Sequence, residues 1–285
     1  MRLRDGLLTL IAIFLLGSVP AQATETITWA YNHFPPIQIR TGPFPQMGFA
    51  DGLQKHLIQT MDSYEHKSIK ASIARTLAMF KTRHDIIYIA LLKSPDREGY
   101  VEYSIPTHVT LPNGVIVRKE RLKQIEPYLN DDGQFLLEKA VTQSNLKCGV
   151  IKGRVYGEAI DNVLRKHKRN PNIFIGVRTN MDKQILPMLK ANRLDYIIGY
   201  PPEAQYYTKA KDNGLEMVSL PVKGMPRYQI GYVAAPKTQW GRDILKKINP
   251  LIRKYRTTRE FQSAYEFWLD EKSITRYRKY TKEVF

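Results

Sequence analysis

Apolar residues fall into short runs that alternate with segments of helical periodicity along most of the chain. Residues 85–92, Asp-Ile-Ile-Tyr-Ile-Ala-Leu-Leu, show no polar alternation, which is typical of a strand covered on both faces of a parallel sheet. Residues 51–61 carry apolar side chains at positions 53, 57, 58 and 61, the spacing of one helix face. The same patterns predict further strands at residues 27–31, 68–73, 114–118, 148–151, 173–177, 195–199 and 228–235. They also predict helices at residues 75–81, 125–140, 156–168 and 181–192, and then two basic helices before the C-terminus.

This alternation of strands and helices predicts an α/β protein with mostly parallel sheets. Residues 79–87 and 188–199 repeat one theme, a helix that ends near a basic residue and runs through an aspartate into a buried strand. Two similar α/β halves in one chain suggest a two-lobed clamp. Because ligands of such sheets bind at the carboxyl ends of strands, we expect the site in the loops after Leu92 and Gly199.

The first 23 residues have the pattern of a secretory signal peptide. Arg2 and Arg4 precede an apolar run at residues 7–16, and Ala21-Gln22-Ala23 has the small-x-small form of a cleavage site. The run is shorter than the roughly 20 residues that a membrane-spanning helix needs, although an uncleaved anchor is the alternative. We therefore expect cleavage after Ala23 and a periplasmic protein.

The charge balance narrows the choice of partner. The 285 residues are 43% hydrophobic and 25% charged, and 44 Lys and Arg against 27 Asp and Glu give a net charge of +17. Such an excess favours anionic partners, which are nucleic acid, an anionic membrane surface or an anionic solute. Export and the even spread of the basic residues argue against nucleic acid. An anionic solute fits both features.

Motifs for covalent or metal chemistry do not stand out. The single cysteine, Cys148, excludes an internal disulfide framework, a zinc ribbon and an iron–sulfur site, and an exported thiol without a partner is expected to be buried. The sequence has no G-x-S-x-G elbow, no H-E-x-x-H pair and no phosphate-binding P-loop. We therefore predict no cofactor, no metal site and no catalytic residue.

One block of the sequence resembles a known family. Residues 92–106, Leu-Lys-Ser-Pro-Asp-Arg-Glu-Gly-Tyr-Val-Glu-Tyr-Ser-Ile-Pro, look like the T-x-E-R…F-S-x-P block of extracytoplasmic solute-binding proteins of family 3, the amino-acid-binding components of bacterial importers. Weaker matches follow in the family's order, and they are residues 34–36, Gly48, residues 153–156, residues 189–195 and residues 228–235. The chain looks closest to a branch with Trp29 ahead of Pro35-Pro36 and Leu-Lys-x-x-x-Arg-Glu at residues 92–98.

The resemblance implies a fold and a function. The fold is the type II periplasmic-binding-protein fold, two α/β lobes joined by two crossing strands, here expected at residues 114–118 and 229–233. The first lobe would comprise residues 24–116 and 230–285, and the second lobe residues 117–229. The function would be capture of a small polar or anionic solute, amino-acid-like or a carboxylate, between the lobes for an ABC-type importer.

The resemblance also implies ligand-binding residues in each lobe. In the family, the position of Arg97 binds the ligand carboxylate, which suits the planar fork of a guanidinium, and Ser94 would add a hydroxyl. The alternative for Arg97 is a surface ion pair with a neighbouring acid. Gly153, Arg154 and Tyr156 lie where the second lobe would present backbone N–H groups at a helix start, although an ordinary turn fits them equally.

Aromatic residues and one departure from the family complete the expected site. Trp29, Tyr31 and Phe34 are candidates for an aromatic wall, but Trp29 and Tyr31 point to one face of their strand, so at least one of them can belong to the core. Amino-acid binders of the family usually carry an acid just after the strand at 195–199, where this chain has Tyr200. Glu203 could substitute if the loop bends. A carboxylate without an ammonium is therefore as plausible a ligand as an amino acid.

Two other functions stay open at this point. The same fold serves a few dehydratases, for which Glu98, Glu158 or Glu203 would be the acid. A monomeric protein of this type could also present its ligand to a membrane sensor rather than to a permease.

Overall fold

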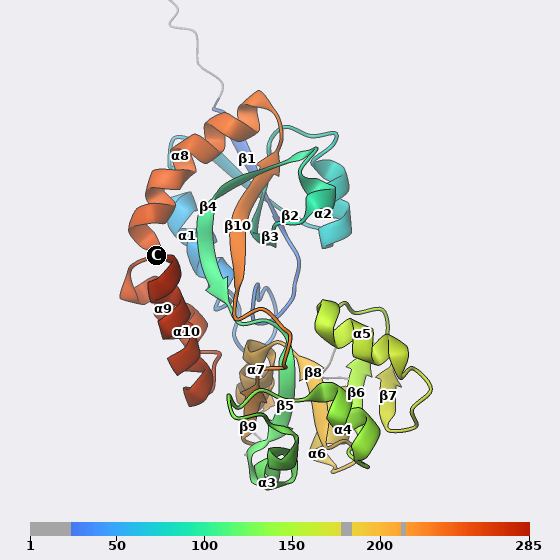
Figure 1. Ribbon diagram of the computed structural model, residues 1–285. Coiled ribbons are helices and arrows are strands. Elements are labelled where there is room, and N and C mark those ends of the chain that lie inside the picture. Colours follow the sequence, from blue (N-terminus) through green and yellow to red (C-terminus); the bar gives the residue numbers. More distant parts are fainter. Residues whose placement is uncertain (1–23, 178–183, 212–214) are drawn as a thin grey trace, which may run out of the picture.

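The computed structural model describes residues 24–177, 184–211 and 215–285. The predicted signal peptide at residues 1–23 lies outside the described residues, and so does the start of the helix predicted at 181–192. No helix in the described ranges combines the length and the apolarity needed to cross a bilayer. The described chain folds into two α/β lobes, which Figure 1 shows one above the other.

The first lobe, the upper one in Figure 1, is built on a five-stranded sheet with the order β2-β1-β3-β10-β4. Its strands are β1 (Thr26–Tyr31), β2 (Glu65–Lys70), β3 (Ile86–Leu92), β4 (Val101–Thr110) and β10 (Gln229–Pro236). β1 pairs in parallel with β2 and β3, whereas β10 pairs antiparallel with β3 and β4. A strand from the C-terminal half of the chain is therefore inserted into the sheet of the first lobe.

Helices cover both faces of this first sheet. α1 (Phe49–Thr60), α8 (Gln239–Tyr255) and α9 (Arg259–Glu266) share one apolar core with alternate residues of the strands, such as Ile87 and Val233. α2 (Ile73–Met79) lies on the other face, where Phe80 packs with Ile86. Neighbours such as Ile86 and Ile87 face opposite cores because successive side chains of a strand alternate. This explains the uninterrupted apolar run of β3.

The second lobe repeats this architecture with a sheet in the order β7-β6-β8-β5-β9. Its strands are β5 (Gly114–Arg118), β6 (Cys148–Ile151), β7 (Ile173–Gly176), β8 (Tyr196–Gly199) and β9 (Met217–Leu220). β6 pairs in parallel with β7 and β8, and β5 pairs antiparallel with β8 and β9. Each sheet therefore has two parallel and two antiparallel pairings, so the sheets are mixed rather than mostly parallel.

Helices also cover both faces of the second sheet. α4 (Leu137–Gln143) and α5 (Glu158–Lys166) share a core with Cys148 and Tyr196, and the short α3 (Leu122–Ile125) lies beside them. α6 (Ile185–Lys190) and α7 (Pro201–Lys211) cover the other face. Cys148 is a buried free thiol, as predicted.

The chain crosses between the lobes twice. β4 leads through residues 111–113 into β5, and β9 leads through residues 221–228 into β10. The predicted crossing strands, residues 114–118 and 229–233, do not span the two lobes. Residues 114–118 pair within the sheet of the second lobe and residues 229–233 within the sheet of the first, where pairing satisfies their backbone groups. The boundary predicted at residue 116 accordingly falls inside β5, which belongs to the second lobe.

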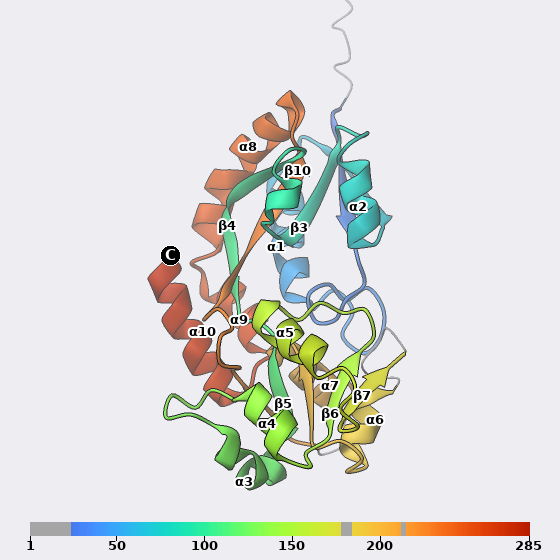
Figure 2. The same ribbon diagram turned by 45° about the vertical axis from the view of Figure 1, so that its right-hand side comes forward.

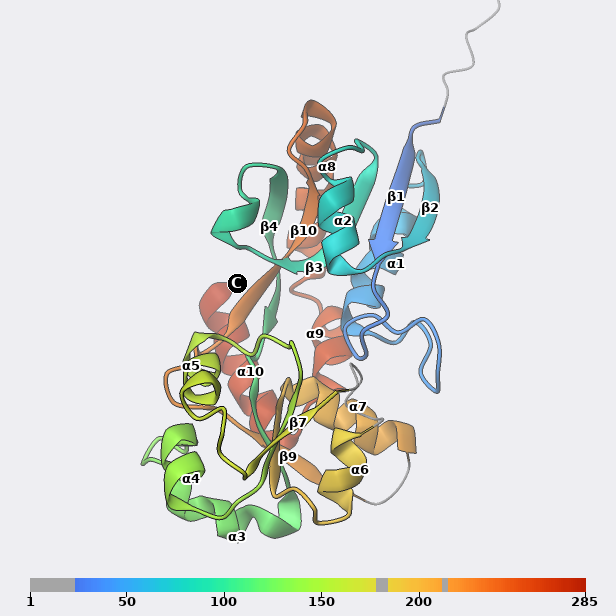
Figure 3. The same ribbon diagram turned by 90° about the vertical axis from the view of Figure 1, so that its right-hand side faces the viewer.

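The C-terminal tail contacts both lobes. α10 (Glu271–Val284) follows the helices of the first lobe but lies beside the second lobe, as Figure 2 shows. Arg276 donates a hydrogen bond to the Ser219 carbonyl at 3.1 Å, and Trp268, just before α10, packs with Ile39 and Tyr206. The loop between β1 and α1 also reaches down to α7 of the second lobe (Figure 3), where Phe44 contacts Tyr206. The tail, predicted to be part of the first lobe, thus bridges the two.

Several elements differ from the sequence prediction. The helix predicted at 125–140 is interrupted, because Pro127 lies in a 3₁₀ turn and Gly133, with φ of +70°, forms another turn. The C-terminal region has three helices instead of two, since Thr258 and Asp270 each cap a new helix by accepting a backbone N–H. β4, β9 and α7 were not predicted, and β2 begins at Glu65 rather than at residue 68.

Candidate functional site

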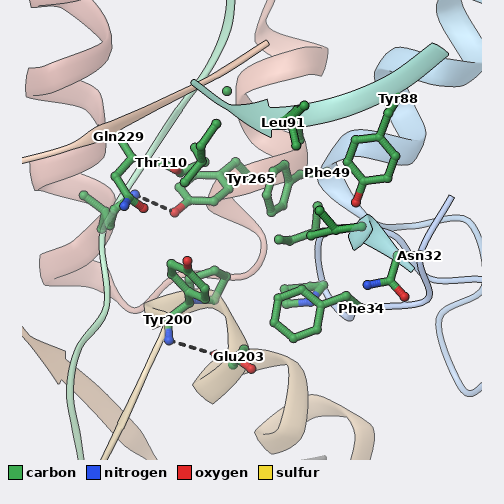
Figure 4. Close-up of a pocket in the computed structure, with 18 of the residues that line it drawn as sticks. Asn32, Phe34, Phe49, Tyr88, Leu91, Thr110, Tyr200, Glu203, Gln229 and Tyr265 are labelled. Atoms are coloured by element: carbon green, nitrogen blue, oxygen red, sulfur yellow. Dashed lines mark hydrogen bonds between the residues drawn. The ribbon is translucent and has the colours of Figure 1, made fainter. Parts of the chain in front are cut away.

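A cavity of about 330 Å³ lies between the two lobes. Figure 4 shows aromatic and polar side chains that converge on it from both lobes and from the tail. The first lobe contributes Asn32, Phe34, Phe49, Tyr88, Leu91, Lys93, Ser94 and Arg97. The end of β4 contributes Thr110, the crossing after it Leu111, and the start of β10 Gln229. α7 and the residue before it contribute Tyr200, Pro202 and Glu203, and α9 contributes Tyr265.

The carboxyl end of β3 places the first charged residues at this cavity. β3 ends at Leu92, and a 3₁₀ turn at Pro95–Arg97 follows, with Ser94 in extended conformation before it. Within β3, Ala90 has φ of +64°, a conformation that non-glycine residues seldom adopt and that tends to occur at functional sites. The expectation that the loop after Leu92 forms part of the site agrees with this placement.

Arg97 lies in the cavity wall and is incompletely paired. Its Nη1 donates a hydrogen bond to the Leu92 carbonyl at 3.1 Å, which fixes the guanidinium plane. Its Nε is 3.8 Å from the Asp96 carboxylate, which is mostly exposed, and this buried Nε has no hydrogen-bond partner among the described residues. An exposed ion pair of this length contributes little. The guanidinium thus retains donor capacity at the cavity.

Ser94 is already engaged by the same turn. Its hydroxyl donates a hydrogen bond to Asp96. This hydrogen bond, with Arg97 nearby, holds the pKa of Asp96 below its usual value. Ser94 can therefore accept from a ligand but has committed its own proton.

The second lobe contributes a buried ion pair beneath the cavity. The Arg154 guanidinium donates to both carboxylate oxygens of Glu203, from Nη1 at 2.9 Å and from Nη2 at 2.5 Å. The Tyr200 backbone N–H donates to the same carboxylate at 2.8 Å, as Figure 4 shows. Burial alone would lower the pKa of Arg154, but the Glu203 carboxylate holds it above its usual value. Arg154 and Glu203 together form a closed, neutral unit.

Aromatic rings make up most of the remaining wall. Phe34, Phe49, Tyr88, Tyr200 and Tyr265 come from five different segments, and their rings surround the space in Figure 4. The Tyr265 hydroxyl accepts a hydrogen bond from the Leu111 N–H at 2.9 Å, which fixes the Tyr265 ring against the crossing at residues 111–113. Burial raises the pKa of Tyr88 to about 12, so this hydroxyl stays neutral.

The structure places the residues predicted for this site in two groups. Arg97, Ser94, Phe34, Tyr200 and Glu203 line the cavity. The other five predicted residues do not line it, and they are Trp29, Tyr31, Gly153, Arg154 and Tyr156.

Trp29 and Tyr31 do not form the expected aromatic wall. Trp29 is 1% exposed, packs in the core under α1 and donates its indole N–H to His66 at 3.0 Å. Tyr31 carries the Arg40 guanidinium over its ring, away from the cavity. Both belong to β1, and the side chains of a strand project from the two faces of the sheet rather than toward the end of the strand, where the cavity lies.

The turn at residues 153–156 is structural rather than a lining of the cavity. The Tyr156 hydroxyl accepts from the Ile151 N–H at 2.7 Å, and the N–H of Tyr156 donates to Asp161. Gly153, with φ of +75°, allows the turn that directs Arg154 toward Glu203. The turn therefore acts on the cavity through Arg154 alone.

Sequence reasoning missed several lining residues. Tyr88 lies inside the apolar run of β3, where it looks like core, and Phe49 lies on the buried face of α1. Gln229 begins β10, and Tyr265 comes from the unpredicted helix α9, so only the tertiary fold brings them together. The described residues contain no group of three or more His, Cys, Asp or Glu side chains placed to hold a metal ion.

Comparison with known sequences gives no match. No family model matches this sequence, and the search of curated proteins finds no match.

Comparison with solved structures does find matches. An ancestral cationic amino acid solute-binding protein matches with a TM-score of 0.62 and 16% identity over 86% of this chain and 96% of its own. A second structure of that ancestral protein is described as a precursor of cyclohexadienyl dehydratase. Substrate-binding domain 2 of Lactococcus lactis GlnP, in open conformation, matches with a TM-score of 0.59 and 13% identity over 87% and 96% of the two chains. The probable amino-acid ABC transporter extracellular-binding protein ytmK of Bacillus subtilis matches with a TM-score of 0.61 and 15% identity over 87% and 99%.

These matches agree with the two mixed sheets and the interlobe cavity described above. At 13–16% identity they bear on the fold. The fold expected from the resemblance to family 3 is confirmed: the chain has the two-lobed α/β fold of amino-acid solute-binding proteins.

Proposed function

We propose that this protein captures a small polar or anionic solute between its two lobes and acts as an extracytoplasmic solute-binding protein. The observation that carries the proposal is Arg97, whose guanidinium lies in the interlobe wall with a buried Nε that has no hydrogen-bond acceptor among the described residues, the Asp96 carboxylate being 3.8 Å away. A guanidinium fixed on one side by the Leu92 carbonyl is preorganised for a carboxylate on the other.

Binding fits the wall better than catalysis does. Glu203 is the one carboxylate among the described lining residues, and Arg154 holds both of its oxygens. A general acid must deliver a proton to the substrate, and both oxygens of this carboxylate instead accept hydrogen bonds from Arg154. Glu98 and Glu158, the other candidate acids of a dehydratase, do not line the cavity. The dehydratase reading therefore has less support, although a precursor of one such enzyme shares the fold.

The N-terminal signal-peptide pattern bears on where the protein acts, and the fold bears on its partner. The N-terminal pattern supports export to the periplasm with cleavage after Ala23. Proteins of the same fold include one described as an ABC transporter extracellular-binding protein, which supports delivery of the solute to an inner-membrane permease. A membrane sensor is the alternative receiver, and the binding protein itself would be a monomer.

The proposal is tested by identifying what the native protein holds. The protein is purified from the periplasm without denaturation, and small molecules released by acid are measured by mass spectrometry. Arg97→Ala is the test variant, and Arg193→Ala, which removes an exposed guanidinium, is the matched control. We expect one small acid with the wild type and the control but not with Arg97→Ala. Retention of the same compound by Arg97→Ala would refute the role of Arg97.

Closure of the lobes is a second readout. Small-angle scattering should show a smaller radius of gyration when the protein is saturated with its ligand. Unchanged dimensions at saturation would refute capture by closure.

A further inference from the structure

We propose that the cavity selects carboxylates with an apolar, ring-sized body and discriminates against α-amino acids, and that Arg154 is the residue that sets this specificity. The inference rests on the proposed function and deepens it by naming the class of ligand. Three features carry it: the charge of the first lobe's wall, the closed ion pair of the second lobe, and the aromatic lining.

The first lobe presents positive charge to the cavity. Arg97 and Lys93 both line it. The Lys93 ammonium lies 4.4 Å from the centre of the Tyr232 ring and 5.4 Å from that of Tyr103, and neither ring lines the cavity, so Arg97 is the cation that carries the charge preference. Asp96 is the nearby acid, and it is exposed and turned to Ser94 and Arg97. A ligand carboxylate is attracted to this end, and an ammonium is repelled from it.

Among the described residues of the second lobe, none that lines the cavity offers a free negative charge to offset that repulsion. The side chain of Glu203 is 2% exposed, and its two oxygens accept from Arg154 at 2.9 and 2.5 Å and from the Tyr200 N–H at 2.8 Å. An ammonium placed here would leave water without gaining a counter-charge. The acid that could have held a ligand ammonium, Glu203, is thus already paired with the protein's own guanidinium.

The guanidinium of Arg154 is itself held in place by rings. Its Cζ lies 5.6 Å from the centre of the Phe34 ring, 5.4 Å from Tyr156 and 5.3 Å from Tyr200. Contacts with three rings and a bidentate carboxylate leave it little freedom to swing aside for a ligand. The neutral pair is therefore a fixed part of the wall.

The rest of the wall suits an apolar body. Rings of Phe34, Phe49, Tyr88 and Tyr265 line a space of about 330 Å³, at the lower end of the usual range for small-molecule sites. Gln229 adds one buried amide oxygen without a partner among the described residues. This acceptor is neutral, so it can meet a ligand hydroxyl but cannot offset the charge of an ammonium.

A matched pair of ligands tests the charge preference directly. 3-Phenylpropionate and L-phenylalanine share the ring, the carboxylate and the distance between them, and they differ in the α-ammonium. Isothermal calorimetry on the wild-type protein should show 3-phenylpropionate binding at least tenfold more tightly. Equal or tighter binding of L-phenylalanine would overturn the inference while leaving solute capture intact.

Variants of the ion pair test the role of Arg154. Arg154→Leu frees the Glu203 carboxylate, so the ratio of the two affinities should shift toward L-phenylalanine by tenfold or more. Adding Glu203→Gln to this variant removes the freed charge and should restore the wild-type preference. A single variant that keeps the wild-type ratio would overturn the assignment of specificity to Arg154. The wild-type measurement decides the ligand class even if Arg154→Leu does not fold.

The remaining outcomes separate this inference from the proposed function. If neither probe binds but another solute does, the ring-sized class is rejected and solute capture stands. If no compound from a panel of carboxylates and amino acids binds, and no small molecule co-purifies, the proposed function fails and this inference fails with it.

Discussion

The Arg154–Glu203 pair should behave as one neutral unit, so removing either charge alone should lower the free energy of unfolding strongly. The side chains of Arg154 and Glu203 are 14% and 2% exposed. Removing one partner of a buried ion pair leaves an uncompensated charge and typically costs about 3–5 kcal/mol. Arg154→Leu strands the more deeply buried group, so it should lie at the upper end of that range, and Glu203→Gln should lie below it. Removing both charges, Arg154→Leu with Glu203→Gln, should cost less than either single change.

Urea unfolding followed by tryptophan fluorescence measures these differences. The double-mutant cycle should give a coupling free energy of at least about 2 kcal/mol between the two residues. The exposed pair Lys166–Glu138, with side chains 68% and 50% exposed, is the control and should couple far more weakly. If Glu203→Gln costs under about 1 kcal/mol, or if the double variant is no better than the singles, the reasoning about a closed pair is wrong.

Three further predictions concern groups outside the cavity. Burial lowers the pKa of His108 to about 4, so the folded state binds fewer protons than the unfolded state between pH 6.5 and 4. The free energy of unfolding should therefore fall by about 3 kcal/mol as the pH is lowered through that window. Unfolding free energies of wild type and His108→Gln that run parallel with pH would contradict this. Burial raises the pKa of Cys148 to about 12, so a thiol reagent should label it far more slowly in native protein than in urea, and equal rates would refute its burial. Trp268 is fully buried between Ile39 and Tyr206, so Trp268→Ala should cost about 3–5 kcal/mol in urea unfolding, and a cost no larger than that of Trp240→Ala, at a partly buried position, would speak against it.

The sequence predicts best those elements whose signal is local. The apolar run of β3 reflects burial on both faces of the strand, and the helical spacing of α1 reflects burial on one face of the helix. Both elements could therefore be predicted from the local sequence. β4 was missed because Glu102, Ser104 and His108 interrupt its apolar residues at positions that only its partner strands explain. α7 begins with two prolines, which look like a loop and in fact form its first turn.

The sequence predicted those parts of the site that follow a recognisable strand, with Arg97 and Ser94 after β3 and with Tyr200 and Glu203 after β8. Arg97 and Ser94 follow a recognisable strand, so the sequence placed them at its carboxyl end. The partnership of Arg154 with Glu203 joins residues 49 positions apart, and no local pattern reports it. Tyr265 reaches the cavity from a helix in the tail, and the sequence predicted only that the tail belongs to the first lobe. Contacts between distant segments depend on tertiary packing, and a single sequence does not encode them in periodicity.

The central claim is that Arg97 holds a solute between the lobes. Its most direct test is a thermal-shift screen of wild type, Arg97→Ala and the exposed-site control Arg193→Ala against one panel of carboxylates and amino acids. At least one compound should raise the melting temperature of wild type and Arg193→Ala by mass action. The same compound should leave Arg97→Ala nearly unshifted, because loss of a charge-assisted pair weakens binding by about 2–5 kcal/mol. An equal shift in all three proteins, or no shift with any compound, would contradict the claim.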